Sequence, residues 1–163
     1  MKGKKLPDFN PGNLNFPPDE VKIVRSEGVY KIFDRLRKKY YILTPEEYVR
    51  QRFVDWMIIH LGYPPSLMAN EIGINLNNTI KRCDTVVFSN NGTPLVIVEY
   101  KAPYVEISQE VFNQIYRYNM ALKAKVLIVS NGITHYCCRL TEDYKNYEFL
   151  MHIPSYSELL TII

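Results

Sequence analysis

The sequence predicts an α/β domain in which a central mixed β-sheet is flanked by helices. Two long segments repeat apolar residues at helical spacing, and short runs of alternating or continuous apolar and β-branched residues lie between and after them. Their order, α-β-β-β-α-β-β, is typical of a mixed sheet covered by helices. A chain of 163 residues, 47% of them hydrophobic and 23% charged, has the size and composition of one globular domain.

The N-terminal region is predicted to hold an arm followed by short strands. Residues 1–20 are rich in proline and have little apolar periodicity, so we expect an extended or flexible arm. Residues 21–163 then form the single domain. Its first predicted strands are Val21–Arg25, Val29–Phe33 and Tyr40–Leu43.

The first helix is predicted to begin after Thr44. Thr44 is a favourable N-cap, Pro45 suits the first helical position, and Glu47 stands three residues after the cap, which predicts a capping box. The apolar residues that follow at helical spacing are Val49, Phe53, Met57 and Leu61. Gly62 and the two prolines after Tyr63 end the helix.

Three strands are predicted next, at Glu71–Leu76, Cys83–Phe88 and Leu95–Tyr100. The dipeptide Asn91-Gly92 between the last two is a strong hairpin signal.

The second helix is predicted from Glu106 to Leu122. The residues expected along one of its faces are Ile107, Val111, Gln114 and Tyr118. A buried strand at Val126–Val129, a strand at Ile133–Arg139 and a closing helix at Pro154–Ile163 complete the fold.

The charge distribution and the cysteines indicate which partners and which cellular compartment to expect. The net charge of +3 is uneven, because residues 1–40 hold ten Lys/Arg against five Asp/Glu, which permits contact with a polyanion. A solvated basic face explains the same charge. Three cysteines, two of them adjacent, match neither a zinc motif nor a disulfide framework, so we expect a reduced, cytoplasmic protein. No apolar stretch is long enough to span a membrane, and no secretory signal begins the chain.

Asp84, Glu99 and Lys101 are the residues that indicate chemistry. Glu99 and Lys101 share one side of a strand whose neighbours are apolar, where charged groups are costly unless they are paired or bind a metal. If the hairpin pairs through its Asn-Gly turn, Asp84 lies close to Glu99. Two converging carboxylates would hold one Mg²⁺, with Mn²⁺ as a substitute, and water and a phosphate oxygen would complete the shell. The alternative is a buried Glu–Lys pair with Asp84 as a turn residue.

These residues resemble the PD-(D/E)xK nuclease superfamily. Gln114 and Tyr118 match the Q-x-x-x-Y motif of one of its branches, although a half-buried helix face explains that pair equally well. Together with Thr44–Gln51 and Val129–Gly132, the chain most closely resembles the N-terminal nuclease domain of type I restriction enzyme R subunits over roughly residues 29–140. The resemblance implies a restriction-endonuclease-like fold and Mg²⁺-dependent hydrolysis of DNA.

The resemblance also implies roles for individual residues. Asp84 and Glu99 bind the metal, Lys101 supports the attacking water and the developing charge, and Gln114 and Tyr118 orient the lysine, the water or the DNA backbone.

An acidic residue on the first helix is a further feature of this family. We carry it onto Glu46, with Glu47 second because Glu47 already serves the capping box. Glu46 is expected to pair with Arg50 one turn later; the alternative role of that pair is a surface ion pair worth a few tenths of a kcal/mol.

One departure from the R subunits concerns their ATP-driven motor. The sequence has no G-x-x-x-x-G-K-[ST] motif, so we expect a stand-alone nuclease-like domain that is targeted by a separate motor or specificity protein, by a homodimer or by DNA structure. The alternatives are a non-cleaving module that binds DNA or a partner through the same fold, and an RNA substrate, since the chemistry acts on either phosphodiester.

Overall fold

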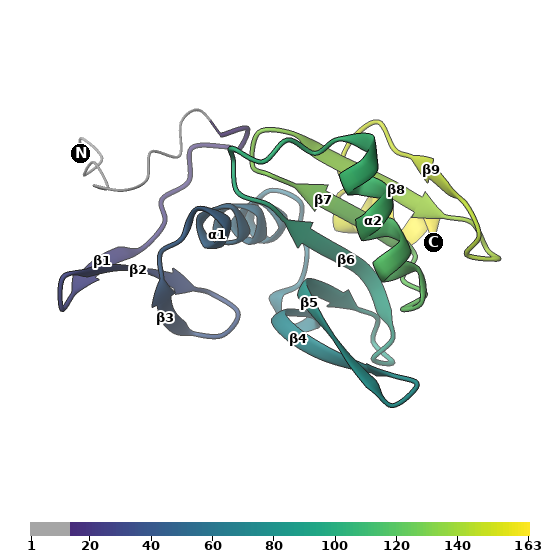
Figure 1. Ribbon diagram of the computed structural model, residues 1–163, viewed down its shortest axis with the longest axis horizontal. Helices are drawn as coiled ribbons and strands as arrows, with labels where there is room; N and C mark the ends of the chain where they lie inside the picture. The colour runs from purple at the N-terminus through teal and green to yellow at the C-terminus, as the bar shows by residue number, and fades with distance from the viewer. Residues whose placement is uncertain (1–13) are drawn as a thin grey trace.

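A computed structural model describes residues 14–163 and shows two β-sheets and three α-helices in that range. The six-stranded sheet has the order β4-β5-β6-β7-β8-β9, in which β6 and β7 are parallel and the other neighbours are antiparallel. Helices α1 and α2 lie on opposite sides of its middle strands (Figure 1). The predicted mixed sheet flanked by helices is therefore confirmed.

The elements have the following bounds. The small sheet contains β1 (Ile23–Ser26), β2 (Val29–Asp34) and β3 (Lys39–Ile42). The six-stranded sheet contains β4 (Met68–Leu76), β5 (Thr79–Phe88), β6 (Pro94–Tyr100), β7 (Val126–Ser130), β8 (His135–Leu140) and β9 (Tyr147–Phe149). The helices are α1 (Pro45–Ile59), α2 (Gln109–Met120), α3 (Tyr156–Ile162) and a 3₁₀ turn, η1 (Pro65–Leu67). Strand β9 and η1 were not predicted from the sequence.

Side-chain alternation along β6 divides the core between the two helices. Val96 and Val98 pack with Phe53 of α1 and its neighbours, whereas Ile97 packs with Phe112 of α2. All of these side chains are buried, so β6 is covered on both faces. The three cysteines are buried in the same core and form no disulfide.

The face of α2 that contacts the sheet differs from the predicted one. Its buried residues are Phe112 and Asn119, with Ile115 and Tyr116 partly buried between them. These follow the i, i+3, i+4, i+7 spacing of one helical stripe. The predicted stripe through Val111, Gln114 and Tyr118 was wrong because Phe112 and Tyr116 pack against the aromatic ring of Tyr147 on β9. The helix also begins at Gln109, later than predicted, where Ser108 caps Val111 N.

A chain of buried polar contacts connects the small sheet to the large one. The Tyr100 hydroxyl donates to Thr85 Oγ1 at 2.9 Å, and Thr85 donates to Asn70 Oδ1 at 2.6 Å. Asn70 in turn donates to Asp34 Oδ2, which also accepts from Arg37 Nε at 2.6 Å. The small sheet is thus joined to the centre of β5 and β6.

Residues 14–20 belong to the predicted N-terminal arm and contain no helix or strand. The Phe16 ring contacts Phe53 and Trp56 of α1, and Arg52 Nη2 donates to Pro17 O at 2.5 Å. This part of the arm is therefore packed against α1. Residues 1–13 lie outside the described residues.

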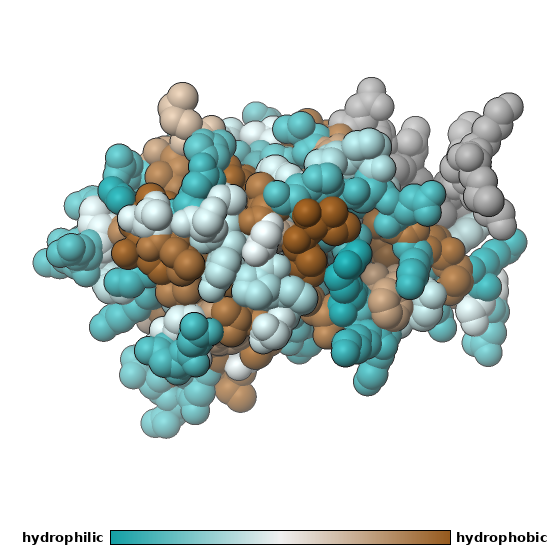
Figure 2. Space-filling model, turned by 180° about the vertical axis from the view of Figure 1, so that it is seen from behind, coloured by the Kyte–Doolittle hydropathy of each residue, from teal (hydrophilic) through white to brown (hydrophobic). Residues whose placement is uncertain are grey.

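Apolar side chains on the rear surface form separate patches among polar ones (Figure 2). Within residues 14–163, no helix combines the length and the apolar character needed to cross a membrane.

Candidate active site

Asp84 of β5 and Glu99 of β6 lie side by side. The antiparallel register pairs Thr85 with Val98, so the next position along places Asp84 opposite Glu99. Directly opposed residues in such a pair have Cβ atoms roughly 5 Å apart. The backbone N–H of Tyr100 donates to Asp84 Oδ2 at 2.9 Å and fixes that carboxylate at the end of β6. The hairpin thus brings the two acidic residues together.

The Glu99 carboxylate has a raised pKa. Burial and then the adjacent Asp84 raise the pKa of Glu99, Lys81 and the amide of Asn119 act in the opposite direction, and the net pKa is about 8. Its Oε1 atom is buried and has no hydrogen-bond partner among the described residues. A buried carboxylate oxygen without a donor is costly, and a cation would satisfy it.

Glu46 and Lys101 border the same site from different elements. Glu46 lies in the first turn of α1, where burial and then Asp84 raise its pKa, and Lys101 and Arg50 oppose the rise. Lys101 follows β6, and its backbone N–H donates to Ser130 O at 2.9 Å. Among residues 14–163, neither side chain forms an ion pair within 4.0 Å. Glu99 is not paired with Lys101 either, so the alternative of a simple buried Glu–Lys pair was wrong.

Glu47 has a different role from the one predicted. Thr44 Oγ1 accepts from Glu47 N at 3.1 Å, as the capping signal predicts. The Glu47 carboxylate does not complete the capping box, because it accepts from Arg37 Nη2 at 3.1 Å and Gln51 Nε2 at 2.9 Å. It also lies 3.2 Å from Arg50 Nη1.

Arg50 does not pair with Glu46 as predicted. Its buried guanidinium reaches Glu71 at 2.5 Å and Asp84 Oδ1 at 3.6 Å, in addition to Glu47. Three carboxylates therefore compete for this one cation, and they raise its pKa although burial acts to lower it.

Glu71 was missed by the sequence analysis. Its backbone has a φ of +52°, in the left-handed region that a glutamate rarely adopts, although the register of β4 with β5 continues without a shift from Asn70 to Ile72. Its carboxylate pairs with Arg50 and with Arg82 Nε, each at 2.5 Å. No signal in the sequence marks this irregular position.

The two residues of the Q-x-x-x-Y motif lie on α2 at the surface. Gln114 is exposed and has no hydrogen bond among the described residues. Tyr118 is 57% exposed, and its ring lies over Lys81 Nζ, 3.3 Å from the ring centroid. No contact between either side chain and the carboxylates is found in this part of the chain, so their roles stay predictions.

The donor set fits a hard divalent cation that keeps part of its water shell. Within the described range, no three His, Cys, Asp or Glu side chains form a complete metal site. Mg²⁺ is commonly held by one or two carboxylates plus water and substrate phosphate, so Asp84 and Glu99 suffice. The unpartnered Glu99 oxygen is the observation that supports this fit.

Comparison with protein families identifies one that covers this site. A family model described as the type I restriction enzyme R protein N terminus matches residues 45–154 of the chain, from the start of α1 to the approach of α3. A comparison with curated proteins finds no match.

Proposed function

We propose that this chain, which belongs to the family of type I restriction enzyme R protein N termini, hydrolyses phosphodiester bonds of DNA in a reaction that requires Mg²⁺. The observation that carries the proposal is the adjacent pair Asp84 and Glu99, with a buried Glu99 oxygen that has no partner in the described chain. Such a pair is costly in its doubly charged form unless a proton or a cation joins it.

Asp84 and Glu99 would hold the ion, and Mn²⁺ could replace Mg²⁺. The bound ion would polarise the phosphate and favour ionisation of water. In the proposed hydrolysis, the oxygen of water would form a bond to phosphorus, and the bond from phosphorus to the leaving sugar oxygen would break. The proton of the water goes to a carboxylate, and solvent supplies a proton to the leaving oxygen.

In this proposal Lys101 orients the attacking water, and Glu46 accepts its proton. The Lys101 ammonium has no ion pair within 4.0 Å in residues 14–163, so it is available to orient the water and to offset charge at the phosphate. Glu46 accepts the proton, because burial and Asp84 raise its pKa above that of an ordinary glutamate. Gln114 and Tyr118, both exposed on α2, contact the DNA backbone.

Calorimetry of Mg²⁺ or Mn²⁺ binding, with wild type and Asp84→Ala, tests the metal site. We expect binding by wild type and its loss in Asp84→Ala. Glu148→Ala, which removes an exposed carboxylate of β9, is the control and retains binding. A DNA-cleavage assay with Lys101→Ala follows, in which we expect a loss of roughly a hundredfold or more. Full cleavage by folded Asp84→Ala or Lys101→Ala would contradict the assignment.

A non-cleaving DNA-binding module is the alternative function. One observation favours it. Asp84 Oδ2 already accepts a hydrogen bond from Tyr100 N, and Asp84 Oδ1 lies near Arg50, so fewer carboxylate oxygens are free to bind a metal. This module would bind DNA with an affinity that falls as salt rises, and it would give no metal-dependent product. One site cuts one strand, so an active enzyme would nick duplex DNA or act as two copies.

A further inference from the structure

Lys81 is a buried lysine on β5, three residues before Asp84. Its side chain is 6% exposed, and its Nζ donates to Asn119 Oδ1 at 3.0 Å and to the backbone carbonyl of Tyr118. The same Nζ lies 3.3 Å from the centroid of the Tyr118 ring. The Lys81 ammonium therefore makes two hydrogen bonds and one cation–π contact with consecutive residues of α2. These residues lie 37 and 38 positions after Lys81 in the sequence.

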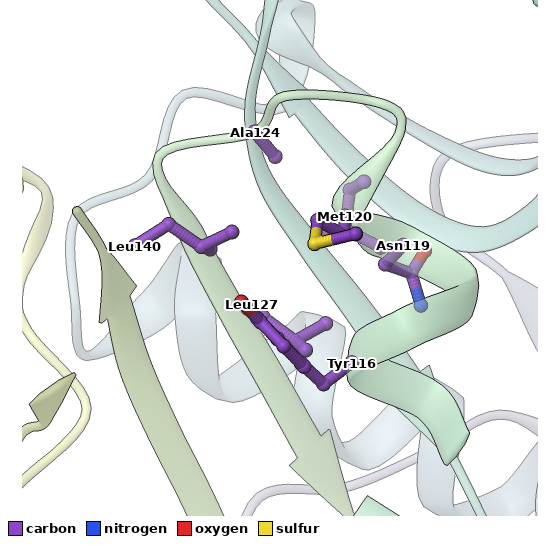
Figure 3. Close-up of a pocket in the computed structure, with 7 residues that line it drawn as sticks. Tyr116, Asn119, Met120, Ala124, Leu127 and Leu140 are labelled. Carbon is purple, nitrogen blue, oxygen red and sulfur yellow. The ribbon is translucent and has the colours of Figure 1, made fainter. Parts of the chain in front are cut away.

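The end of α2 explains why a cation belongs there. Tyr118 O lies in the last turn, where helix carbonyls have no partner within the helix and carry partial negative charge. Lys81 supplies the missing donor. Figure 3 shows this turn, with Asn119 and Met120, lying over the strands that carry Leu127 and Leu140.

Asn119 connects Lys81 to the carboxylate pair. It is 5% exposed, and its Nδ2 donates to Ile115 O at 2.9 Å, which fixes the orientation of the amide. Both Asn119 and Lys81 act on Glu99, whose charged form they favour. The lysine that the Tyr118 ring contacts is thus Lys81, whereas the resemblance implied that Tyr118 orients Lys101, the water or the DNA backbone.

We propose that Lys81 is a positioning residue of the candidate site, which holds the last turn of α2, with Tyr118 and Asn119, against β5, the strand that carries Asp84. The inference rests on the proposed function for its effect on catalysis. Its structural part, the attachment of α2 to β5, is measured without DNA or metal.

The substitution Lys81→Met tests the proposal because it keeps the aliphatic stem and removes the charge. Lys125→Met is the matched control, since Lys125 also lies over a tyrosine ring, that of Tyr144 at 5.3 Å, away from the carboxylates. Amide hydrogen exchange is measured at residues 117–122 with no metal present. We expect it to accelerate by at least about tenfold in Lys81→Met, in line with the loss of hydrogen bonds from a charged donor, and to stay unchanged in the control.

Tyr118 variants separate the ring contact from a role of the hydroxyl. Tyr118→Phe keeps the ring over Lys81, so the exchange protection is expected to persist, whereas Tyr118→Leu loses part of it. If Lys81→Met does not fold, the comparison of Tyr118→Phe with Tyr118→Leu still tests the contact between Lys81 and α2. Protection that is equal in wild type and in both Lys81→Met and Tyr118→Leu would overturn the proposal.

Kinetics and metal binding test the effect on the reaction. In Lys81→Met, kcat falls by about tenfold while KM changes by less than about threefold, because the lost function is positioning. Mg²⁺ affinity stays equal or rises, since a positive charge has left the neighbourhood of Glu99. A general structural defect would weaken metal binding as well, and that result would contradict a positioning role. Failure of the proposed function is recognised separately, because wild type would then neither bind Mg²⁺ nor cleave DNA.

Discussion

Two arginines that share one carboxylate give a direct test of how burial sets the strength of the ion pairs in this site. Arg50 and Arg82 each lie 2.5 Å from a carboxylate oxygen of Glu71. The Arg50 side chain is 4% exposed and the Arg82 side chain is 71% exposed. Substituting each arginine by methionine keeps the aliphatic stem and removes the cation, so the two variants differ mainly in burial.

We expect Arg50→Met to lower the free energy of unfolding by about 3 kcal/mol. Removing one partner of a buried ion pair costs roughly 3–5 kcal/mol, and the carboxylates left behind are partly exposed, which favours the lower end. For a chain of this length, that loss lowers Tm by roughly 6–12 °C. Arg82→Met is expected to cost at most about 1 kcal/mol, because exposed ion pairs are screened by water.

Thermal and urea unfolding followed by circular dichroism, without divalent ions, measure both variants. The difference between wild type and Arg50→Met should shrink in acid. Burial alone would raise the pKa of Glu71, but Arg50 and Arg82 outweigh it and lower the pKa. A lowered carboxyl pKa contributes stability at neutral pH that is lost as pH falls through the folded-state pKa. Equal destabilisation by the two substitutions would refute the reasoning from burial.

Two further predictions concern Glu99 and Tyr63. Because the pKa of Glu99 is raised to about 8 in the folded chain, the folded state binds more protons than the unfolded state, and without divalent ions Tm should fall as pH rises from about 5 to about 8. Glu99→Gln should flatten this decline, and an unchanged slope would argue against the raised pKa. The buried Tyr63 hydroxyl donates to Pro154 O at 2.9 Å, so Tyr63→Phe should cost about 1–2 kcal/mol in urea unfolding by leaving that carbonyl without a donor. The exposed hydroxyl of Tyr104, removed by Tyr104→Phe, is the control, and an equal cost in both would contradict a role for this bond.

The pairing of the two strands that carry the carboxylates could be predicted because a local turn signal marks it. Asn91-Gly92 joins two strongly apolar strands, and Gly92 adopts a φ of +82° in the turn. The turn joins β5 to β6, and a one-residue register shift between Val87 and Phe88 then sets Thr85 opposite Val98 and Asp84 beside Glu99. The sequence does not mark this shift. The start of α1 was likewise predictable, because Thr44 caps it through a contact only three residues away.

The face of α2 and the partners of the charged residues could not be predicted because distant contacts decide them. Two stripes of α2, one residue apart, both contain aromatic residues, and only packing against β9 selects the one with Phe112. Glu47 fits a local capping box, yet Arg37, ten residues earlier, attracts its carboxylate instead. Lys81 sits in a polar stretch that gives no sign of burial, and its partner Asn119 is 38 residues away.

The ion pairs around α1 divide the acidic residues of the site into two groups with different roles. Glu47 and Glu71 are each held by arginines at 3.2 Å or less, so their charges are already compensated within the fold. Glu46 and Glu99 have no such partner in residues 14–163, and the pKa of each is raised. Asp84 lies between the groups, 3.6 Å from Arg50.

This division favours Glu46 over Glu47 as the helix carboxylate of the proposed reaction. A carboxylate held by two arginines has little capacity to accept a proton or to bind a cation, whereas Glu46 and Glu99 are destabilised in their charged forms until a cation arrives. The arginines of the first group keep α1 against β4 and β5, and so hold Glu46 near Asp84. In this arrangement the compensated carboxylates stabilise the fold around the candidate site, and the uncompensated ones remain available for the proposed metal and water.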